Sequence, residues 1–413
     1  MKLKITKCEN LSGTVNISGS KNVTLPIIAA ALLSKKKVIL RNIPLITDVL
    51  LMIEIIKSMG VYVKREKHRL VIKAKSFNPM IDSKDVTKFR GSYYLIGACL
   101  ARYNMCSIKC PGGCNFSKRP IDMHIKAFEE LGFKIDKYNE VLYIKKEQET
   151  KSEIVFDKKS LGTTINTIIA SSLLNKPIKL INISIEPEVL ETIIFLKKLG
   201  INIIQKNDNL YIFKNEIKRN IHFKIISDRI EAGSYMLLAS AFKNSEVIIK
   251  NAPTKYLESV IKTLEDLGSN IEIKENNIIV KGKSVKALNL EINEYPSFPT
   301  DLQPILSTIL LRGNNESTIK DNIYPKRSSH ISELTKMNAK IRNYKDKIII
   351  YKSDLIGTRV SAKDLRMAFG LVIAGCIASG ETIIENAEIL LRGYEQPILK
   401  LKKIGVKLTE YIS

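Results

Sequence analysis

The stretch Leu196–Ile203, with the sequence LKKLGINI, contains the pattern that decides the fold. Apolar residues at helical spacing stop at Gly200, and apolar and polar residues alternate directly after it. Glycine readily adopts the left-handed conformation that ends a helix, and alternation is typical of a strand. The stretch therefore predicts a helix that ends just before Gly200 and a strand that follows it.

The same pattern occurs six times along the chain. The copies are centred on Gly60, Gly132, Gly200, Gly268, Asn338 and Gly405, at spacings of 72, 68, 68, 70 and 67 residues. About 30 residues before each copy lies an apolar helix rich in small residues, followed by a strand, as in LPIIAAALL (25–33) and KVILRN (37–42). Each repeat is thus predicted to read helix, strand, helix, strand, strand.

This period of about 70 residues is longer than the roughly 20–50 residues of common solenoid repeats. Six units also divide naturally into two sets of three. We therefore predict an α/β protein with two similar lobes and a cleft between them, because clefts of this kind are where small-molecule sites tend to lie.

The net charge of +24, from 66 Lys+Arg against 42 Asp+Glu, suggests a nucleic-acid or anionic-surface partner. However, only 14 of the basic residues are arginine, and the lysines are spread from Lys2 to Lys403. No zinc-finger, RRM or KH signature accompanies them. We interpret most of the charge as solvated surface and expect no nucleic-acid partner. A non-catalytic nucleic-acid-binding protein is kept as an alternative.

The N-terminal sequence MKLKITKCEN lacks the apolar stretch of a signal peptide. The longest apolar runs, 25–33 and 369–378, are about half the roughly 20 residues that span a bilayer. Six cysteines are too few for a disulfide framework, and no His or Cys pair completes a zinc site with Cys110 and Cys114. We expect a cytoplasmic protein with no membrane partner and no metal site.

Six separated motifs carry a resemblance to a known family. They are SGSKNVTLP (18–26), PGGCNFSKRPIDMHIKAFEELG (111–132), SDRIEAGSY (227–235), FPTDLQP (298–304), KDLRMAFGLVIAG (363–375) and RGYE (392–395). In this order, and with the sixfold repeat, they resemble the enolpyruvyl transferases, specifically the branch that acts on UDP-N-acetylglucosamine. The resemblance runs essentially end to end. It implies a two-lobed inside-out α/β barrel with three repeats per lobe, the first lobe at 21–228 and the second at 1–20 and 229–413.

The resemblance also implies a reaction. The enolpyruvyl group of phosphoenolpyruvate would move to the 3′-hydroxyl of UDP-N-acetylglucosamine, with release of phosphate, by addition and elimination through a tetrahedral ketal. This is the first committed step of peptidoglycan synthesis, on which cell shape and division depend. No cofactor or metal is implied, and we expect a monomer. The sister branch that acts on shikimate 3-phosphate is the alternative, although it lacks the PGGC loop.

The resemblance assigns the proton donor to Cys114, which would also form a covalent adduct with phosphoenolpyruvate and be alkylated by fosfomycin. Gly112 and Gly113 would make its loop mobile, and the cations Lys118 and Arg119 would lower the thiol pKa. From the residues alone, a buried apolar cysteine remains an alternative.

Asp301 is implied as the group that takes the proton of the sugar hydroxyl, since a carboxylate in a closed cleft can act as a general base. From the residues alone, Asp301 is better explained as the N-cap of the helix that follows it, and a residue can fill both roles. Lys21 and Arg392 complete the implied catalytic set.

Two anionic substrates need fixed cations, and arginine binds planar oxyanions bidentately. By resemblance, the phosphoenolpyruvate site consists of Lys21, Asn22, Cys114, Arg119, Arg327, Arg366 and Arg392. The nucleotide-sugar site consists of Arg90, Arg119, Pro120, Ile121, Asp122, Met123, Lys158, Lys159, Ser160, Leu161, Asp301 and Ile323. The backbone N–H groups of the helix after Ser160 suit a diphosphate, although Ser160 could be only a cap.

Five positions depart from the family pattern, one of which is Asn338 in place of the glycine of the fifth repeat. Thr47 stands where the family has Lys, Ile165 replaces an acid, Ile185 replaces Arg, and Pro325 replaces Glu. The residues implied to contact substrate are intact, so we expect activity. Changes in residues that support a site can lower rate or stability.

Overall fold

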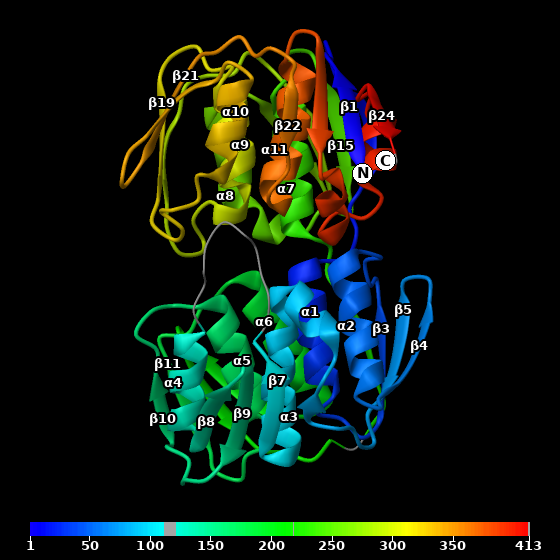
Figure 1. Cartoon of the computed structure of the whole chain (residues 1–413), viewed down its shortest axis with the longest axis vertical. Coiled ribbons are helices and arrows are strands. Elements are labelled where there is room, and N and C mark those ends of the chain that lie inside the picture. Colours follow the sequence, from blue (N-terminus) through cyan, green and yellow to red (C-terminus); the bar gives the residue numbers. More distant parts are fainter. Residues whose placement is uncertain (111–120, 218, 412–413) are drawn as a thin grey trace. The chain divides into compact units, whose positions relative to one another are not determined.

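The computed structural model describes residues 1–110, 121–217 and 219–411. By its internal contacts the chain divides into two compact units (Figure 1). One contains Met1–Ser18 and the chain from Ser227 onward, and the other contains the described residues from Gly19 to Ile226. Each unit is described separately below.

The unit that begins at Gly19 contains three four-stranded sheets, with the orders β14-β3-β5-β4, β6-β7-β9-β8 and β10-β11-β13-β12. Its helices are α1 (Lys21–Ala31), α2 (Thr47–Ser58), α3 (Tyr94–Tyr103), α4 (Asp122–Glu130), α5 (Leu161–Ser171) and α6 (Pro187–Leu199), with the short helices η1 (Lys84–Lys88) and η2 (Arg90–Tyr93). Its strands are β3 (Lys37–Arg41), β4 (Tyr62–Glu66), β5 (Arg69–Lys73), β6 (Met80–Ile81), β7 (Met105–Lys109), β8 (Phe133–Tyr138), β9 (Val141–Lys146), β10 (Glu153–Val155), β11 (Ile178–Ile181), β12 (Asn202–Lys206), β13 (Asn209–Phe213) and β14 (Ile221–Lys224).

The other unit repeats this plan with sheets of the orders β16-β17-β15-β2, β18-β19-β21-β20 and β22-β23-β1-β24. Its helices are α7 (Arg229–Ser240), α8 (Glu258–Asp266), α9 (Gln303–Leu310), α10 (Ser329–Lys336), α11 (Leu365–Ile377) and α12 (Pro397–Lys403), with the short helices η3 (Thr254–Tyr256), η4 (Thr300–Leu302) and η5 (Ala387–Arg392). Its strands are β1 (Lys2–Thr6), β2 (Ser12–Asn16), β15 (Glu246–Lys250), β16 (Asn270–Lys274), β17 (Asn277–Lys281), β18 (Asn289–Ile292), β19 (Ser317–Asp321), β20 (Lys340–Asn343), β21 (Ile348–Tyr351), β22 (Arg359–Ser361), β23 (Glu381–Glu385) and β24 (Leu408–Tyr411).

The six predicted helix ends are confirmed by their backbone conformation. The residues at the centres of the copies have φ values of 89°, 87°, 109° and 99° at the first four glycines, 70° at Asn338 and 90° at Gly405. Asparagine therefore serves the fifth copy in the same left-handed conformation that glycine supplies elsewhere. The residue type at these six positions therefore predicts where the helices end.

The predicted five-element repeat was one strand short. Each sheet contains one further short strand, which either precedes the first helix of the repeat or comes from a distant segment. This strand pairs in parallel with the strand that follows that helix. Examples are β14 with β3 and β2 with β15. In five of the six described sheets, the antiparallel hairpin that follows completes the sheet. In the last sheet, β1 lies antiparallel between β23 and β24, so the N-terminal strand folds with the C-terminal part of the chain.

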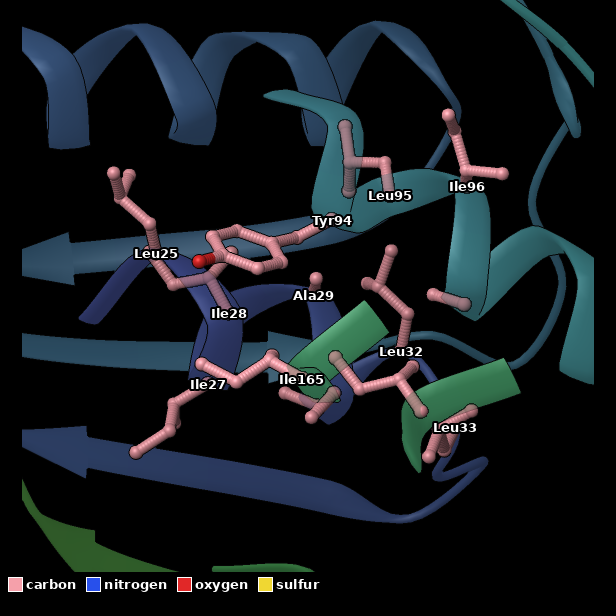
Figure 2. Close-up of a cluster of buried hydrophobic side chains, with 14 of the residues drawn as sticks. Leu25, Ile27, Ile28, Ala29, Leu32, Leu33, Tyr94, Leu95, Ile96 and Ile165 are labelled. Carbon is pink, nitrogen blue, oxygen red and sulfur yellow. The ribbon is translucent and has the colours of Figure 1, made fainter. Parts of the chain in front are cut away.

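The helix that opens each repeat lies in the hydrophobic core of its unit. In the unit from Gly19, α1 packs against α3, α5 and α6, and Ala29–Ala31 let these helices approach closely. Figure 2 shows Leu25, Ile27 and Ile28 of α1 in the same buried cluster as Tyr94 and Ile165. Because Ile165 is wholly buried, the isoleucine that replaces the family's acid adds to this core and leaves no buried carboxylate to be paired.

In the other unit α11 packs against α9, and α7 also contacts α9. These helices are almost completely buried along their length. Among the described residues, no helix is long and apolar enough to cross a membrane.

Candidate active site

Asp301 lies in η4 between two arginines that come from different segments. Arg327, in the loop before α10, donates from both Nη1 and Nη2 to Oδ1 of Asp301, each at 3.1 Å. Arg366, in the first turn of α11, donates from Nε and Nη2 to Oδ2, at 3.1 and 2.9 Å. Three residues that the sequence placed in the site are therefore in direct contact.

This cluster is buried and carries an excess of positive charge. The side chains of Arg327 and Arg366 are 4% and 8% exposed, and that of Asp301 is 30% exposed. Burial alone would lower the pKa of Arg366, but the negative charges of Asp301 and Asp228 outweigh it and raise that pKa above its ordinary value. Both arginines are thus suited to hold a planar anion. An incoming carboxylate would compete with Asp301 for them and free its oxygens to accept a proton.

The alternative role of Asp301 as a helix cap is wrong. No side chain caps the start of η4 or of α9, and the carboxylate faces the arginines instead. The segments around it are fixed by Asp321 at the end of β19. Its carboxylate accepts the Thr300 hydroxyl at 2.7 Å and the backbone N–H groups of Ile323 and Tyr324 at 2.9 and 2.8 Å. Ile323, predicted to contact the nucleotide-sugar, is 36% exposed in this segment.

The start of α11 fixes the backbone of Arg366. Asp364 caps this helix, since its Oδ1 accepts the N–H groups of Arg366 and Met367, each at 3.0 Å. Its other oxygen accepts the Ser329 hydroxyl at 2.8 Å. Arg366 therefore projects from a capped, buried helix start, which limits the positions that its guanidinium can take.

Lys21 and Asn22 are the first residues of α1, in the unit that begins at Gly19. Ser20 caps this helix by accepting the N–H of Val23 at 3.3 Å. The Lys21 ammonium lies 3.3 Å from Oδ2 of Asp48, and these side chains are 15% and 5% exposed. Thr47, the residue that departs from the family pattern, begins α2 directly before Asp48.

Arg90, one of the predicted residues, lies in a second group of side chains, which is centred on Tyr93. The guanidinium of Arg90 lies 5.4 Å from the centre of the Tyr93 ring, and His124 of α4 packs edge-on against that ring at 4.7 Å. Burial, with a smaller contribution from the Arg90 charge, lowers the pKa of His124 to about 3, so its ring is neutral. Asn166 of α5 donates to the Tyr93 carbonyl at 2.9 Å. Sequence reasoning missed Tyr93, His124 and Asn166, although His124 lies inside the quoted motif 111–132.

The start of α5 is built as the sequence predicted. Ser160 caps it by accepting the N–H of Thr163 at 3.3 Å, and Leu161 is its first residue. Lys158 is exposed, and the Lys159 ammonium lies 3.6 Å from Oδ2 of Asp208. Asp122 and Met123 form the first turn of α4, preceded by Ile121.

Arg392 ends η5 and is partly exposed, whereas Tyr394 and Glu395 of the same motif are buried. Cys114, Arg119 and Pro120 lie outside the described residues. Within the part of the chain that the structure describes, no group of three or more His, Cys, Asp or Glu could hold a metal ion.

Known proteins resemble this chain over its whole length. The family model of EPSP synthase (3-phosphoshikimate 1-carboxyvinyltransferase) matches residues 5–401. A curated relative from Wolbachia pipientis wMel, named UDP-N-acetylglucosamine 1-carboxyvinyltransferase, is 38% identical over 412 residues, which cover 97% of this chain and 96% of the relative. A Lactococcus lactis protein named UDP-N-acetylglucosamine 1-carboxyvinyltransferase 2 is 37% identical over 416 residues, covering 98% of each chain.

Solved structures share the fold at low identity. The enolpyruvyl transferase NikO from Streptomyces tendae matches with a TM-score of 0.90 and 18% identity, covering 99% of this chain and 98% of that chain. EPSP synthase from Acinetobacter baumannii matches with a TM-score of 0.77 and 16% identity, covering 100% of both chains. These matches confirm the fold class predicted from the sequence.

Proposed function

The chain belongs to the enolpyruvyl transferase family, that of EPSP synthase, and from this membership we propose that it transfers the enolpyruvyl group of phosphoenolpyruvate to the 3′-hydroxyl of UDP-N-acetylglucosamine. The observation that carries the proposal is the identity of 35–38% to enzymes named for this reaction, over nearly their whole length. The cluster of Asp301 with Arg327 and Arg366 supports it, because it offers a base beside two anion-binding cations.

The proposed reaction begins when Arg327 and Arg366 bind the carboxylate of phosphoenolpyruvate. Asp301 then takes the proton of the sugar 3′-hydroxyl as this oxygen bonds to C2 of phosphoenolpyruvate, and Cys114 donates a proton to C3, which gives the tetrahedral ketal. In the elimination, the Cys114 thiolate takes a proton back from C3 as the bond from C2 to the phosphate oxygen breaks. Lys21, Asn22, Arg119 and Arg392 are proposed to bind the phosphate that leaves. The covalent adduct on Cys114 remains a prediction.

The nucleotide-sugar is proposed to bind along the starts of α4 and α5, and the resemblance adds Asp301 and Ile323 to its contacts. Arg90, Lys158 and Lys159 supply positive charge for the diphosphate, and Ser160 and Leu161 begin a helix whose N–H groups favour anions. Arg119, Pro120, Ile121, Asp122 and Met123 complete the proposed site. The relatives favour this acceptor over shikimate 3-phosphate, since the enzymes named for the latter are only 16–17% identical. They likewise favour an enzyme over a nucleic-acid-binding protein.

Phosphate release tests the proposed function. Purified protein with phosphoenolpyruvate and UDP-N-acetylglucosamine is expected to release one phosphate per enolpyruvyl ether formed, and none with shikimate 3-phosphate as acceptor. Absence of release with UDP-N-acetylglucosamine would overturn the proposal. Sedimentation velocity tests the remaining prediction of a monomer, of 46.6 kDa. A cytoplasmic location also remains a prediction.

Replacing Gly162 with Ala is expected to weaken binding of the nucleotide-sugar. A Cβ at Gly162 would overlap the Tyr93 hydroxyl and lie 3.2 Å from its Cζ. Because Tyr93 is buried and packs on Tyr94 and His124, it has little room to move. We expect the KM for UDP-N-acetylglucosamine to rise about tenfold, as the start of α5 shifts. Tyr93→Phe in the same chain removes the overlapping oxygen and should restore most of the affinity. An unchanged KM in Gly162→Ala would contradict this assignment.

A further inference from the structure

The backbone N–H of Arg327 closes a turn that contains Pro325. It donates to the Tyr324 carbonyl at 2.9 Å, so residues Tyr324–Arg327 form a hydrogen-bonded turn with Pro325 at its second position. Proline is favoured at this position because its ring fixes φ at the value that such turns need. Pro325 is exposed and stands where the family has Glu. This departure from the family pattern therefore suits the turn that presents Arg327.

The Arg327 guanidinium has contacts outside the Asp301 carboxylate. Its Nη1 donates to the Thr300 carbonyl at 2.7 Å. Its central carbon lies 5.1 Å from the centre of the Tyr324 ring, within the range of a cation–π interaction. A substrate carboxylate that took the place of Asp301 would leave both of these contacts intact. Thr300 and Tyr324 can therefore hold the guanidinium while its anionic partner changes.

The carboxylate of Asp321 anchors both Thr300 and Tyr324. Its Oδ2 accepts the Thr300 hydroxyl at 2.7 Å, and its Oδ1 accepts the N–H groups of Tyr324 and Ile323 at 2.8 and 2.9 Å. Asp321 is 6% exposed and is the last residue of β19, where the sheet fixes its backbone. Hydrogen bonds to an ionised acceptor are about twice as strong as those between neutral groups. Asp321 thus ties the two segments that contact Arg327 to the end of a paired strand.

We propose that Asp321 is a positioning residue, which holds Arg327 in the orientation that binds the carboxylate of phosphoenolpyruvate, and that Pro325 assists it by preforming the turn. This inference rests on the proposed function. Asp321 acts through Thr300 and Tyr324, whose contacts with Arg327 do not depend on the state of the catalytic carboxylate. The guanidinium is then in place before the substrate arrives, which lowers the cost of ordering the site on binding.

Replacing Asp321 with Ala tests this role, since it removes all three hydrogen bonds. We expect the KM for phosphoenolpyruvate to rise about 10- to 100-fold, the factor that corresponds to loss of a hydrogen bond to a charged group. Asp321→Asn keeps an oxygen for the two N–H groups, as asparagine does in many turns, so its KM should rise at most about threefold. A merely structural role would lower the fraction of active enzyme and leave the KM unchanged.

Thr300→Val provides the same test with a smaller change. It keeps the shape of the side chain and removes only the hydroxyl that Asp321 accepts. The KM for phosphoenolpyruvate should rise in the same direction as in Asp321→Ala, by about three- to tenfold, because one of the two anchored segments is released. This variant decides the question if Asp321→Ala does not fold, and an unchanged KM in it would contradict the proposal.

A double-mutant cycle tests whether Asp321 acts through Arg327. The measurement is the dissociation constant of phosphoenolpyruvate by calorimetry, which does not require turnover. Arg327→Ala lacks the guanidinium that Asp321 is proposed to orient, so adding Asp321→Ala to it should weaken binding by less than about threefold. Equal weakening with and without Arg327 would show that Asp321 acts on another group and would overturn the proposal.

Pro325→Gly tests the contribution of the preformed turn. Glycine leaves this turn more freedom before the substrate binds, so we expect the KM for phosphoenolpyruvate to rise about two- to fivefold. Pro177→Gly is the matched control, because Pro177 is also exposed and lies directly before β11 in the other unit. It should leave this KM unchanged. An unchanged KM in Pro325→Gly, or an equal rise in both variants, would overturn the role of Pro325.

The proposed function and the role of Asp321 fail in different ways. A wild-type enzyme that releases phosphate, with an Asp321→Ala variant that binds phosphoenolpyruvate as tightly, would overturn the role of Asp321 alone. A wild-type protein that neither releases phosphate nor binds phosphoenolpyruvate would overturn the proposed function and this inference with it.

Discussion

Asp301→Asn is expected to lower kcat by a factor of about 10²–10⁴, the range in which positioned acids and bases contribute to catalysis. The amide keeps the shape of the side chain but has no basic oxygen, so the sugar hydroxyl keeps its proton. Because the amide offers no charge to pair with Arg327 and Arg366, these two cations are held less well. The measurement is steady-state phosphate release over a range of pH, and the variant's kcat should stay below that of wild type at every pH.

The same substitution should also destabilise the protein. Removing one partner of a buried ion pair costs about 3–5 kcal/mol, and here we expect about 2 kcal/mol because the Asp301 side chain is 30% exposed. Asp136→Asn is the matched control, since Asp136 faces Lys134 at 3.5 Å and both side chains are more than half exposed. It should change neither kcat nor stability. A kcat of Asp301→Asn within threefold of wild type would show that another group takes the proton.

The repeats could be predicted because their signal is local. Each helix end is set by a single residue in the left-handed conformation, which works in the same way at Gly60 and at Asn338. The extra strand of each repeat could not be predicted. β6 contains only Met80 and Ile81, too few residues to show alternation, and β14 finds its partner β3 far away in sequence.

The site could be predicted where a residue type and a motif coincide, as at Asp301, Arg327 and Arg366. The supporting residues could not, because their roles come from contacts between distant segments. The Tyr394 hydroxyl is hydrogen-bonded to that of Ser234, which is 160 residues away, and Asp321 accepts the hydroxyl of Thr300, which is 21 residues away. Nothing in the sequence near either residue indicates these partners. Motifs therefore reveal the residues that bind substrate more readily than those that orient them.

Lys400→Met is expected to cost about 3–5 kcal/mol of stability near pH 8, the cost of leaving a buried charge without its partner. The Lys400 ammonium donates to Glu231 Oε1 and to the Ser18 hydroxyl, at 2.6 and 2.7 Å. Ser18 N–H donates to the other oxygen of Glu231 at 2.8 Å. Glu231 is 1% exposed, so it depends on these contacts to stay ionised.

The pH dependence of this cost has a definite sign. Burial raises the pKa of Glu231 from 4.5 to about 7, although Lys400 and the Ser18 N–H favour its charged form. The folded state thus binds the Glu231 proton more tightly than the unfolded state. The stability gained from this tighter proton binding is lost as the pH rises from about 4.5 to about 7. Without Lys400 the pKa of Glu231 rises further. Lys400→Met should therefore cost less at pH 5, where Glu231 is protonated, than at pH 8.

Unfolding in urea at the two pH values provides the measurement. Lys57→Met is the control, because the ion pair of Lys57 with Glu54 is exposed, and it should cost at most about 0.5 kcal/mol at either pH. Adding Glu231→Gln to Lys400→Met removes the buried charge and should recover most of the stability and abolish its dependence on pH. An equal cost at both pH values would mean that Lys400 stabilises through the packing of its aliphatic chain. Recovery in the double variant would instead show that Glu231 requires Lys400 of α12 to remain ionised in the core.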